Sequence, residues 1–190
     1  MTPEQISELV ELVLAGNKEA FEEIYNETIG GVYRTLYVLT GSERDAEDVA
    51  QNVYLELYRN LNKYDRSRSL LGWVYGITIR QHQAYKRKRW REYRKERKER
   101  EKQTETPPTT EEAVLERFTG GHNDFVIVAL NKLPDKLKQV LVLRYINELS
   151  QQEIADGLGI PVSIISDATN NAEGRTCVDM RKHTRHGFLV

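Results

Sequence analysis

The feature that most restricts the fold is a long stretch with helical apolar spacing and no proline. No proline occurs between Pro3 and Pro107. Up to about residue 100, apolar residues recur every three or four positions, and no segment alternates as a half-buried β-strand does. Proline inside a helix removes a backbone hydrogen bond and clashes with the preceding turn, so a chain without it can form successive helices. We therefore expect an all-α fold.

Two segments show this spacing in detail. Residues 16–41 place apolar side chains on either side of Gly30-Gly31, which predicts two short helices separated by a break. Residues 42–61 begin with Ser42, three positions before Asp45, as expected of a helix N-cap. One stripe about 100° wide on this second segment predicts a core face, made of Ala46, Val49, Ala50, Val53 and Leu57.

A segment rich in Thr, Glu and Pro divides the chain. Residues 103–114 read QTETPPTTEEAV and contain no aromatic residue, which is typical of a flexible linker. Helical apolar periodicity resumes at Asn123. We therefore predict two small helical domains, at residues 1–102 and 123–190, joined by a flexible linker at residues 103–122.

Charge is unevenly distributed along the chain. The net charge is −1, but residues 80–102 contain 12 Lys and Arg against 4 Glu, a net of +8. The remainder has 16 of the 28 basic residues and 25 of the 29 acidic ones, a net of −9. A basic segment on an acidic body indicates a polyanionic partner for that segment and a different partner elsewhere.

Several features bear on localisation. No apolar run approaches 20 residues, so we expect no membrane insertion. The N-terminal segment lacks the basic residues and the cleavage site of an export signal. The one cysteine, Cys177, agrees with a reducing compartment. We expect a cytoplasmic protein.

Enzymatic motifs are missing from the sequence. It contains no Gly-rich phosphate loop, no H-E-x-x-H and no G-x-S-x-G. Cys177, His183 and His186 have no fourth partner that would complete a structural zinc site. We therefore expect neither an enzyme nor a bound metal, cofactor or small-molecule substrate.

Residues 149–162, LSQQEIADGLGIPV, have the spacing of a helix-turn-helix. Ser150 and Glu153 form an S-x-x-E capping box, and Gly159 can take the left-handed conformation that ends a helix. Ile160 and Val162 can fill the angle between two helices. An ordinary helical hairpin with a glycine C-cap is the alternative interpretation.

Cations and aromatic residues are interleaved at the start of the basic segment. Here Arg80, Lys86, Arg87, Lys88 and Arg89 alternate with His82, Tyr85 and Trp90. Such a pattern favours capture of a nucleic-acid single strand, because cations hold phosphates while aromatic rings stack on unpaired bases. From Arg91 onward, Arg and Glu at i,i+4 distances favour a solvent-exposed helix instead.

The side of residues 44–60 opposite the core stripe carries Asp48, Gln51, Asn52 and Leu55. A leucine surrounded by polar groups is how a modest protein interface is usually built, which indicates a partner-binding face. A solvated face with a single exposed leucine is the alternative.

In this order, these segments resemble the extracytoplasmic-function sigma factors, bacterial sigma factors that carry only regions two and four. The resemblance covers residues 16–89 and 133–162. RDAEDVAQNVYLELYRNLNKY, residues 44–64, is similar to the region-two core that docks on RNA polymerase. LLGWVYGITIRQHQAYKRKR, residues 70–89, resembles the part that melts and reads the minus-ten element. LPDKLKQVLVLRYINELSQQEIADGLGIPV, residues 133–162, looks like the start of region four.

The resemblance implies an alternative sigma factor that directs RNA polymerase to promoters. Its partners would be core RNA polymerase, promoter DNA and an anti-sigma protein. The expected polymerase-binding residues are Asp45, Asp48, Gln51, Asn52 and Leu55. The expected minus-ten residues are Lys63, Arg66, Ser67, Arg68, Arg80, Tyr85, Lys86, Arg87 and Arg89, of which the first four lie in a loop similar to the one that accepts the flipped base. The expected helix-turn-helix contacts are Ser150, Gln151, Gln152, Ser163, Ser166, Asn170 and Asn171.

After Val162 the sequence departs from the family pattern. Ser166, Asp167 and Ala168 stand where Lys, Ser and Arg are usual, and no Lys or Arg occurs between Ile160 and Gly174. Several poor helix formers in this stretch forfeit roughly 3 to 4 kcal/mol relative to Ala, so we expect a weak helix. We also expect the resemblance to end at Val162 and minus-thirty-five recognition to be impaired. A shifted reading frame would give such an abrupt end.

Two other functions fit parts of the sequence. A sigma-like interaction module would bind polymerase or an anti-sigma protein without reading promoters. A one-component repressor would also contain a helix-turn-helix, but the chain shows no ligand-domain pattern and places its basic-aromatic segment in the first domain.

Overall fold

The computed structural model describes residues 3–101, 130 and 133–170, and the regular structure among them is helical. In chain order the elements are α1 (Pro3–Leu14), α2 (Lys18–Thr40), α3 (Glu43–Asn60), the 3-10 helix η1 (Leu61–Lys63), α4 (Leu70–Glu101), α6 (Asp135–Leu141), the π-helical turn η3 (Val142–Ile146) and α7 (Gln151–Leu158). A further helix at residues 162–170 follows α7. The expected all-α fold is confirmed. The predicted linker at residues 103–122 lies outside the described residues, and the domain boundaries stay a prediction.

Helix α2 is continuous, so the predicted break at Gly30-Gly31 is wrong. The helix begins after Asn17, whose side chain accepts a hydrogen bond from the Ala20 amide at 3.0 Å. It ends at Gly41, which has a left-handed φ of 70°. Apolar packing on both sides of the two glycines outweighs their poor helix propensity, about 1 kcal/mol each. Gly31 has a packing role instead, because a Cβ atom there would clash with the hydroxyl of Tyr75.

Helix α3 forms as its sequence predicts. The Ser42 side chain accepts a hydrogen bond from the Asp45 amide at 3.3 Å, so the predicted N-cap is confirmed. All five residues of the predicted core stripe are buried. They pack in one hydrophobic cluster with Ile24, Val32 and Leu36 of α2. The opposite face of α3 therefore points outward.

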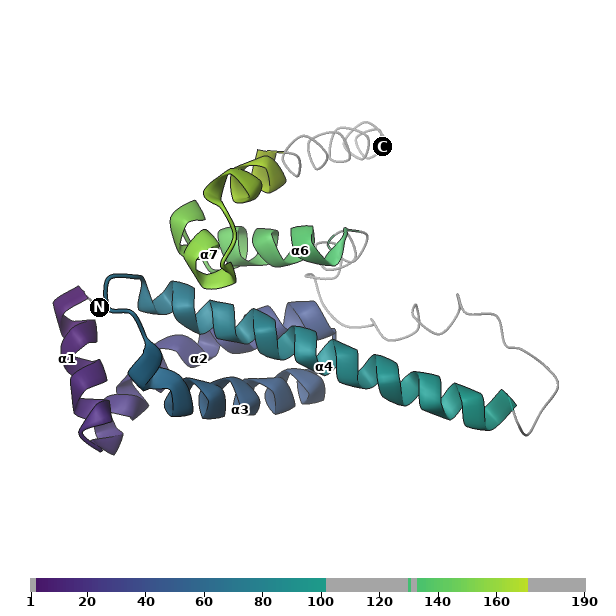
Figure 1. Cartoon of the computed structure of the whole chain (residues 1–190), viewed down its shortest axis with the longest axis horizontal. Helices are drawn as coiled ribbons and strands as arrows, with labels where there is room; N and C mark the ends of the chain where they lie inside the picture. The colour runs from purple at the N-terminus through teal and green to yellow at the C-terminus, as the bar shows by residue number, and fades with distance from the viewer. Residues whose placement is uncertain (1–2, 102–129, 131–132, 171–190) are drawn as a thin grey trace, which may run out of the picture.

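Helix α4 lies between α3 and the second half of the described chain. Figure 1 shows α3 along one side of it and α6 and α7 along the other. Its first half is buried, from Leu70 through Ile79 apart from Leu71 and the half-buried Trp73. Its later part projects beyond the other helices, and residues 86–99 are all exposed, as expected from Arg91 onward. An i,i+4 ion pair joins Lys88 and Glu92 at 4.0 Å in this part.

The second half of the described chain packs on α4 through α7. Buried apolar residues of both halves form one contiguous cluster, in which Val74 and Ile77 of α4 occur together with Ile154 and Ile165. Helices α4 and α7 make the most extensive contact of any pair of elements. Ile154 is buried, with 1% of the residue exposed.

Candidate nucleic-acid and partner interfaces

The outer face of α3 presents four of the five predicted polymerase-binding residues. Asp48, Gln51 and Asn52 are exposed, and the Leu55 side chain is 53% exposed. The Asn52 side chain donates a hydrogen bond to the Asp48 carbonyl at 2.7 Å, which fixes its amide against the helix. The fifth residue, Asp45, is not part of this open face, because its carboxylate pairs with Arg89 of α4.

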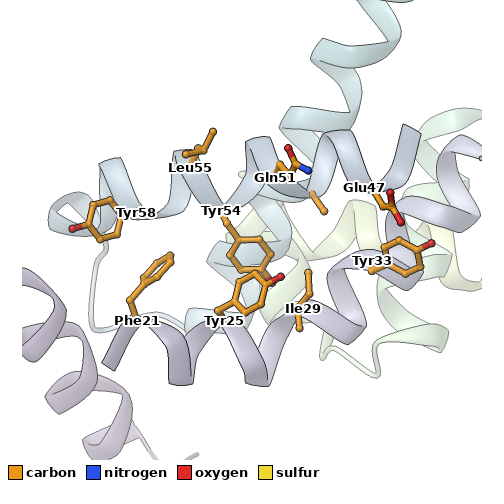
Figure 2. A pocket seen from close by; sticks show the side chains of 10 residues that line it. Phe21, Tyr25, Ile29, Tyr33, Glu47, Gln51, Tyr54, Leu55 and Tyr58 are labelled. Carbon is orange, nitrogen blue, oxygen red and sulfur yellow. The ribbon is translucent and has the colours of Figure 1, made fainter. Parts of the chain in front are cut away.

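An apolar groove of about 680 Å³ lies beside this face, between α2 and α3. Figure 2 shows Phe21, Tyr25, Ile29 and Tyr33 of α2 opposite Tyr54 and Tyr58 of α3, with Leu55 and Gln51 at the rim. The rings of Tyr25 and Tyr54 lie 4.6 Å apart, and those of Phe21 and Tyr58 meet edge to face at 5.1 Å. The surface around Leu55 is therefore wider and more aromatic than α3 alone provides.

Sequence reasoning missed the share of α2 in this groove. Phe21 and Tyr25 are among the apolar residues at helical spacing in residues 16–41, which predict a helix but not this groove; Tyr25 is exposed and Phe21 is half-buried. Tyr54 shows how the rings are held, since its hydroxyl lies 2.9 Å from the Thr28 hydroxyl. Burial raises the pKa of Tyr54 above its ordinary value, so this phenol remains neutral. The available signal in the sequence was the recurrence of tyrosine, because a tyrosine ring packs against apolar neighbours while its hydroxyl needs a polar partner or solvent.

The loop between η1 and α4 carries the next group of predicted residues. Lys63, Arg66, Ser67 and Arg68 are all exposed. Asp65 accepts hydrogen bonds from the Ser67 amide at 3.0 Å and from the Ser67 hydroxyl at 2.7 Å. The same hydrogen bonds hold the pKa of the Asp65 carboxyl below its ordinary value. The loop thus has a defined conformation.

Two further contacts brace this loop. Arg66 forms an ion pair with Glu11 of α1. The Tyr64 hydroxyl donates a hydrogen bond to the Arg68 carbonyl at 2.6 Å, and its ring lies 5.3 Å from that of the half-buried Trp73. A small cavity of about 190 Å³ opens here, lined by Lys63, Tyr64, Asp65, Arg68, Ser69, Trp73 and Asp156. Aromatic walls with cations at the rim suit a nucleobase and its phosphate.

The predicted cations of α4 lie at the surface, but they differ in their partners. Arg80, Lys86, Arg87 and Arg89 are exposed. Lys86 forms an ion pair with Asp135, and Arg80 makes a long hydrogen bond of 3.5 Å to the Gly157 carbonyl. Within the described residues, Arg87 makes no ion pair. The cationic surface is thus partly engaged by the second half of the chain.

Arg89, a predicted minus-ten residue, contacts Asp45, a predicted polymerase-binding residue. Its guanidinium donates hydrogen bonds of 2.8 Å to the Asp45 carboxylate and to the Tyr85 hydroxyl. The guanidinium also lies 5.8 Å from the centre of the Tyr85 ring. The pKa of Arg89 is raised, first by the Tyr85 hydrogen bond and further by the Asp45 charge. Burial raises the pKa of the Tyr85 phenol.

The expectation that His82 stacks on bases is wrong. Its side chain lies in the interior with only 3% of the residue exposed, and Nδ1 has no hydrogen-bond partner within the described part of the chain. Burial lowers the pKa of His82 to about 4, and the neighbouring charges of Lys86 and Lys138 lower it further. His82 is therefore neutral near pH 7. Trp90, by contrast, is exposed and stacks with Tyr93 at 6.1 Å.

The helix-turn-helix forms with the predicted caps. The Ser150 hydroxyl accepts a hydrogen bond from the Glu153 amide, the Glu153 carboxylate accepts one from the Ser150 amide, and Gly159 has a φ of 66°. Residues 162–170, which follow the turn, form a helix despite their poor helix formers. Ile165 is fully buried there, and burial of a side chain of this size stabilises by about 1.5–3 kcal/mol, which offsets much of the propensity cost.

The predicted helix-turn-helix contacts divide into two groups. Ser150 serves in the cap, Gln151 donates to the Thr169 hydroxyl at 3.4 Å, and Gln152 donates to Asp156 at 3.0 Å. Helix 162–170 exposes Ser163, Ile164, Asp167 and Asn170, while Ser166 is half-buried. Asn171 lies outside the described residues, as do Cys177, His183 and His186. The exposed face of this helix therefore carries a negative charge and no positive one.

Comparison with known proteins shows the family to which this chain belongs. Residues 14–92 match sigma-70 region 2, and residues 129–172 match sigma-70 region 4. The extracytoplasmic-function RNA polymerase sigma factor SigW of Bacillus subtilis is 29% identical over 170 residues, covering 84% of this chain and 88% of SigW. The chain belongs to the extracytoplasmic-function sigma factors of the sigma-70 family. Such a sigma factor binds core RNA polymerase and promoter DNA in transcription initiation.

Two solved structures share the fold of this sigma factor. CnrH in complex with the cytosolic domain of CnrY has a TM-score of 0.68 at 20% identity, covering 95% of this chain and 99% of that one. The sigma factor RpoE in complex with the anti-sigma factor NepR from Bartonella quintana has a TM-score of 0.63 at 17% identity, covering 82% and 92%. At these identities the likeness concerns the fold alone.

The family match also corrects one expectation. Region two covers the predicted residues 16–89, but region four continues through residue 172. The expectation that the resemblance ends at Val162 is therefore wrong. Within this additional stretch Ile165 is fully buried, in the hydrophobic cluster that also contains Ile154 of α7. Sigma factors are non-enzymatic regulators of transcription. None of the helices in the described ranges is long and apolar enough to cross a membrane.

Proposed function

We propose that this sigma factor docks on core RNA polymerase through the outer face of α3 together with the neighbouring groove. The observation that carries this proposal is the position of Leu55, which is exposed at the rim of an aromatic groove and flanked by Asp48, Gln51 and Asn52. A leucine that a partner buries among aromatic neighbours supplies affinity, and a polar rim sets the orientation of the partner. A helical segment of polymerase with an apolar stripe is the kind of partner that fits.

The test measures the affinity of the chain for core polymerase. Leu55→Ala combined with Asp48→Lys should weaken binding by about 1–3 kcal/mol, because the anchor is truncated and a rim charge is reversed. Leu14→Ala is the matched control, since Leu14 of α1 is similarly exposed but lies outside the groove. The melting temperature should stay the same in both variants. Unchanged polymerase affinity in the double variant would exclude this docking face.

We further propose that residues 63–89 bind the non-template strand of the opened minus-ten element. The cavity beside Trp73 would hold one base, and the exposed cations of α4 would hold phosphates. Binding of the strand by the holoenzyme should fall steeply with salt, because neutralised phosphates release counterions. Salt-independent binding would favour the alternative of a sigma-like interaction module.

Recognition of the minus-thirty-five element is proposed to be weak in this chain. The support comes from the exposed face of helix 162–170, where Asp167 would meet the DNA polyanion and only Asn170 could read a base among the described residues. Transcription by the holoenzyme should therefore tolerate a scrambled minus-thirty-five element.

We propose an anti-sigma protein as a regulator, because structurally similar sigma factors of the same fold have been solved with such partners. The chain acts without catalysis of its own and in the cytoplasm, where polymerase and promoter DNA are found. Copurification of an inhibitory partner with the chain from its host would test the first of these points.

A further inference from the structure

We propose that the part of α4 beyond Arg89 binds the non-template strand next to the minus-ten element, as single-stranded DNA. This inference rests on the proposed minus-ten site at residues 63–89 and adds a second surface to it. Figure 1 shows this part of α4 projecting beyond the other helices, and residues 86–99 are all exposed. Side chains around the whole helix are therefore accessible here.

The two sides of this projecting helix carry different side chains. At about 100° per residue, residues 87–98 divide into an arc of about 160° without an acidic residue and an opposite side that carries Glu92 and Glu96. The arc, which we call the cationic-aromatic face, consists of Arg87, Trp90, Arg91, Tyr93, Arg94, Arg97 and Lys98. Basic and acidic residues that are mixed along the sequence are thus separated in space.

Cations of the cationic-aromatic face lack the acidic neighbours that the opposite side has. No acidic residue lies three or four positions from Arg87, Arg91 or Arg94, the distances at which side chains meet on a helix. Among the described residues, none of these three forms an ion pair. Lys88, on the opposite side, pairs with Glu92 at 4.0 Å. The opposite side therefore stabilises the helix, and the charge of the cationic-aromatic face stays uncompensated.

Two aromatic rings lie within this face. Trp90 is 61% exposed and Tyr93 is 48% exposed, and their ring centroids lie 6.1 Å apart with the planes 28° from parallel. Exposed rings beside cations suit a single strand, because every base has a face that stacks on an aromatic ring while cations hold the phosphates. The chemistry of the face thus fits a polyanion with unpaired bases.

The position of the face indicates which strand it binds. Arg87 belongs both to the cationic-aromatic face and to the predicted minus-ten residues, so the two surfaces are continuous on one helix. From Arg87 to Lys98 the face spans about 16 Å, which accommodates several further nucleotides. A strand held by the minus-ten residues can reach it without crossing another element.

This extension lies largely outside the matched family regions. Region 2 ends at residue 92 and region 4 begins at residue 129. Tyr93, Arg94 and Lys98 are therefore features of this chain and not of either matched region. They lengthen the proposed strand-binding surface beyond the part that the family match covers.

The test measures strand binding by the holoenzyme with fluorescein-labelled probes of two lengths. Both carry the non-template strand of a promoter that the holoenzyme transcribes. The short probe contains the minus-ten element alone, and the long probe contains about eight further nucleotides on each side. A third probe is the long one as a duplex. The short probe tests the minus-ten site, and the difference between the long and short probes tests the cationic-aromatic face.

Trp90→Ala should lower the affinity for the long single strand by about fivefold or more, because the stacking of one base is lost. Trp90→Phe keeps an aromatic ring and should recover most of this loss. Affinity for the short probe should stay the same in both variants. Alanine favours a helix more than tryptophan does, so α4 should remain helical, which circular dichroism checks.

Two double variants compare the two sides of the helix. Arg94→Ala with Lys98→Ala removes two cations from the cationic-aromatic face, and Lys88→Ala with Lys95→Ala removes two from the opposite side. The first should lower the slope of log affinity against log salt for the long probe by about 1.4, or about 0.7 for each phosphate contact. The second is the matched control, since it loses the same charge, and it should leave the slope unchanged.

The outcomes separate this inference from the proposed function. Unchanged affinity of the Trp90→Ala holoenzyme for the long single strand, or equal slopes in the two double variants, would overturn the inference. An equal loss of affinity for the duplex probe would also overturn it, because unpaired bases would then not be required. A loss of affinity for core polymerase in the same variants would assign the face to polymerase instead of DNA. Failure of the unmodified holoenzyme to bind the short probe would show that the minus-ten site itself is wrong.

Discussion

The guanidinium of Arg89 lies 2.8 Å from the carboxylate of Asp45, which joins α4 to the first turn of α3. The Asp45 side chain is mostly covered, whereas that of Arg89 is about half exposed. The resemblance assigns Asp45 to polymerase and Arg89 to DNA, but the structure makes each the partner of the other. Part of the Arg89 charge is thus compensated before any phosphate approaches, and the cations of α4 are not equivalent.

Arg87 should therefore contribute more to strand binding than Arg89. Arg87→Ala should lower the slope of log affinity against log salt by about 0.7, the value for one phosphate contact on a single strand. Arg89→Ala should lower it less, because Asp45 already neutralises that charge. The measurement is a salt titration of single-strand binding by the holoenzyme. Lys95→Ala, in the exposed end of α4, is the control, and equal slopes for the Arg87 and Arg89 variants would contradict the argument.

Neighbouring glycines of α2 should respond in opposite directions to alanine. Gly30→Ala should stabilise the chain by up to about 1 kcal/mol, since alanine favours the helix and meets no atom there. Gly31→Ala should destabilise it by about 1–3 kcal/mol, because the added methyl group displaces the Tyr75 hydroxyl. Urea denaturation of both variants gives the free energies of unfolding. A stabilised Gly31→Ala chain would show that Tyr75 moves aside without cost.

His82 should make stability fall on the acid side of neutrality. Its pKa is about 4 in the folded chain against an ordinary value of 6.5, so the unfolded chain binds the proton first as pH falls. Stability is therefore full above pH 6.5 and is lost as pH falls toward 4. Between pH 7 and pH 5 this one group should reduce the free energy of unfolding by about 2 kcal/mol.

His82→Gln isolates this contribution from that of the carboxylates. Between pH 7 and pH 5 the variant should lose about 2 kcal/mol less of its free energy of unfolding than the unmodified chain does, even if its stability at pH 7 is lower. The charged neighbours of His82 are Lys86, Lys138 and Asp135, and all three are retained in the variant. Identical pH dependence in the two chains would mean that His82 is not buried in its neutral form.

Restoring charge to the exposed face of helix 162–170 should restore minus-thirty-five dependence. Ser163→Lys, Asp167→Lys and Asn170→Arg place cations at exposed positions, where they can reach phosphates and base edges. The readout is the ratio of holoenzyme transcription from intact and scrambled minus-thirty-five elements. Cations placed instead at Ser166 and Ala168 should help less, since both positions are half-buried. Specific minus-thirty-five binding by the unmodified chain would contradict the charge argument.

The sequence by itself determined the local structure of this protein. The Ser42 cap, the reciprocal Ser150 and Glu153 hydrogen bonds and the left-handed Gly159 all depend on residues within a few positions of one another. The core stripe of α3 follows from helical periodicity in the same way. The surface of α3 around Leu55 could be predicted for the same reason, because the side of a helix opposite its core stripe points outward.

Only the tertiary structure decided which of these surfaces are covered, and by what. The fold brings Asp135 to Lys86 and Glu153 to Ser69. These pairs are 49 and 84 positions apart in the chain, and no local pattern encodes them. The burial of His82, the continuity of α2 through Gly31 and the folding of helix 162–170 around Ile165 depend likewise on what another element places against them. Propensities and caps are each worth about 1 kcal/mol and act within one turn. Burial and close packing between distant segments are worth more, and they depend on the fold as a whole.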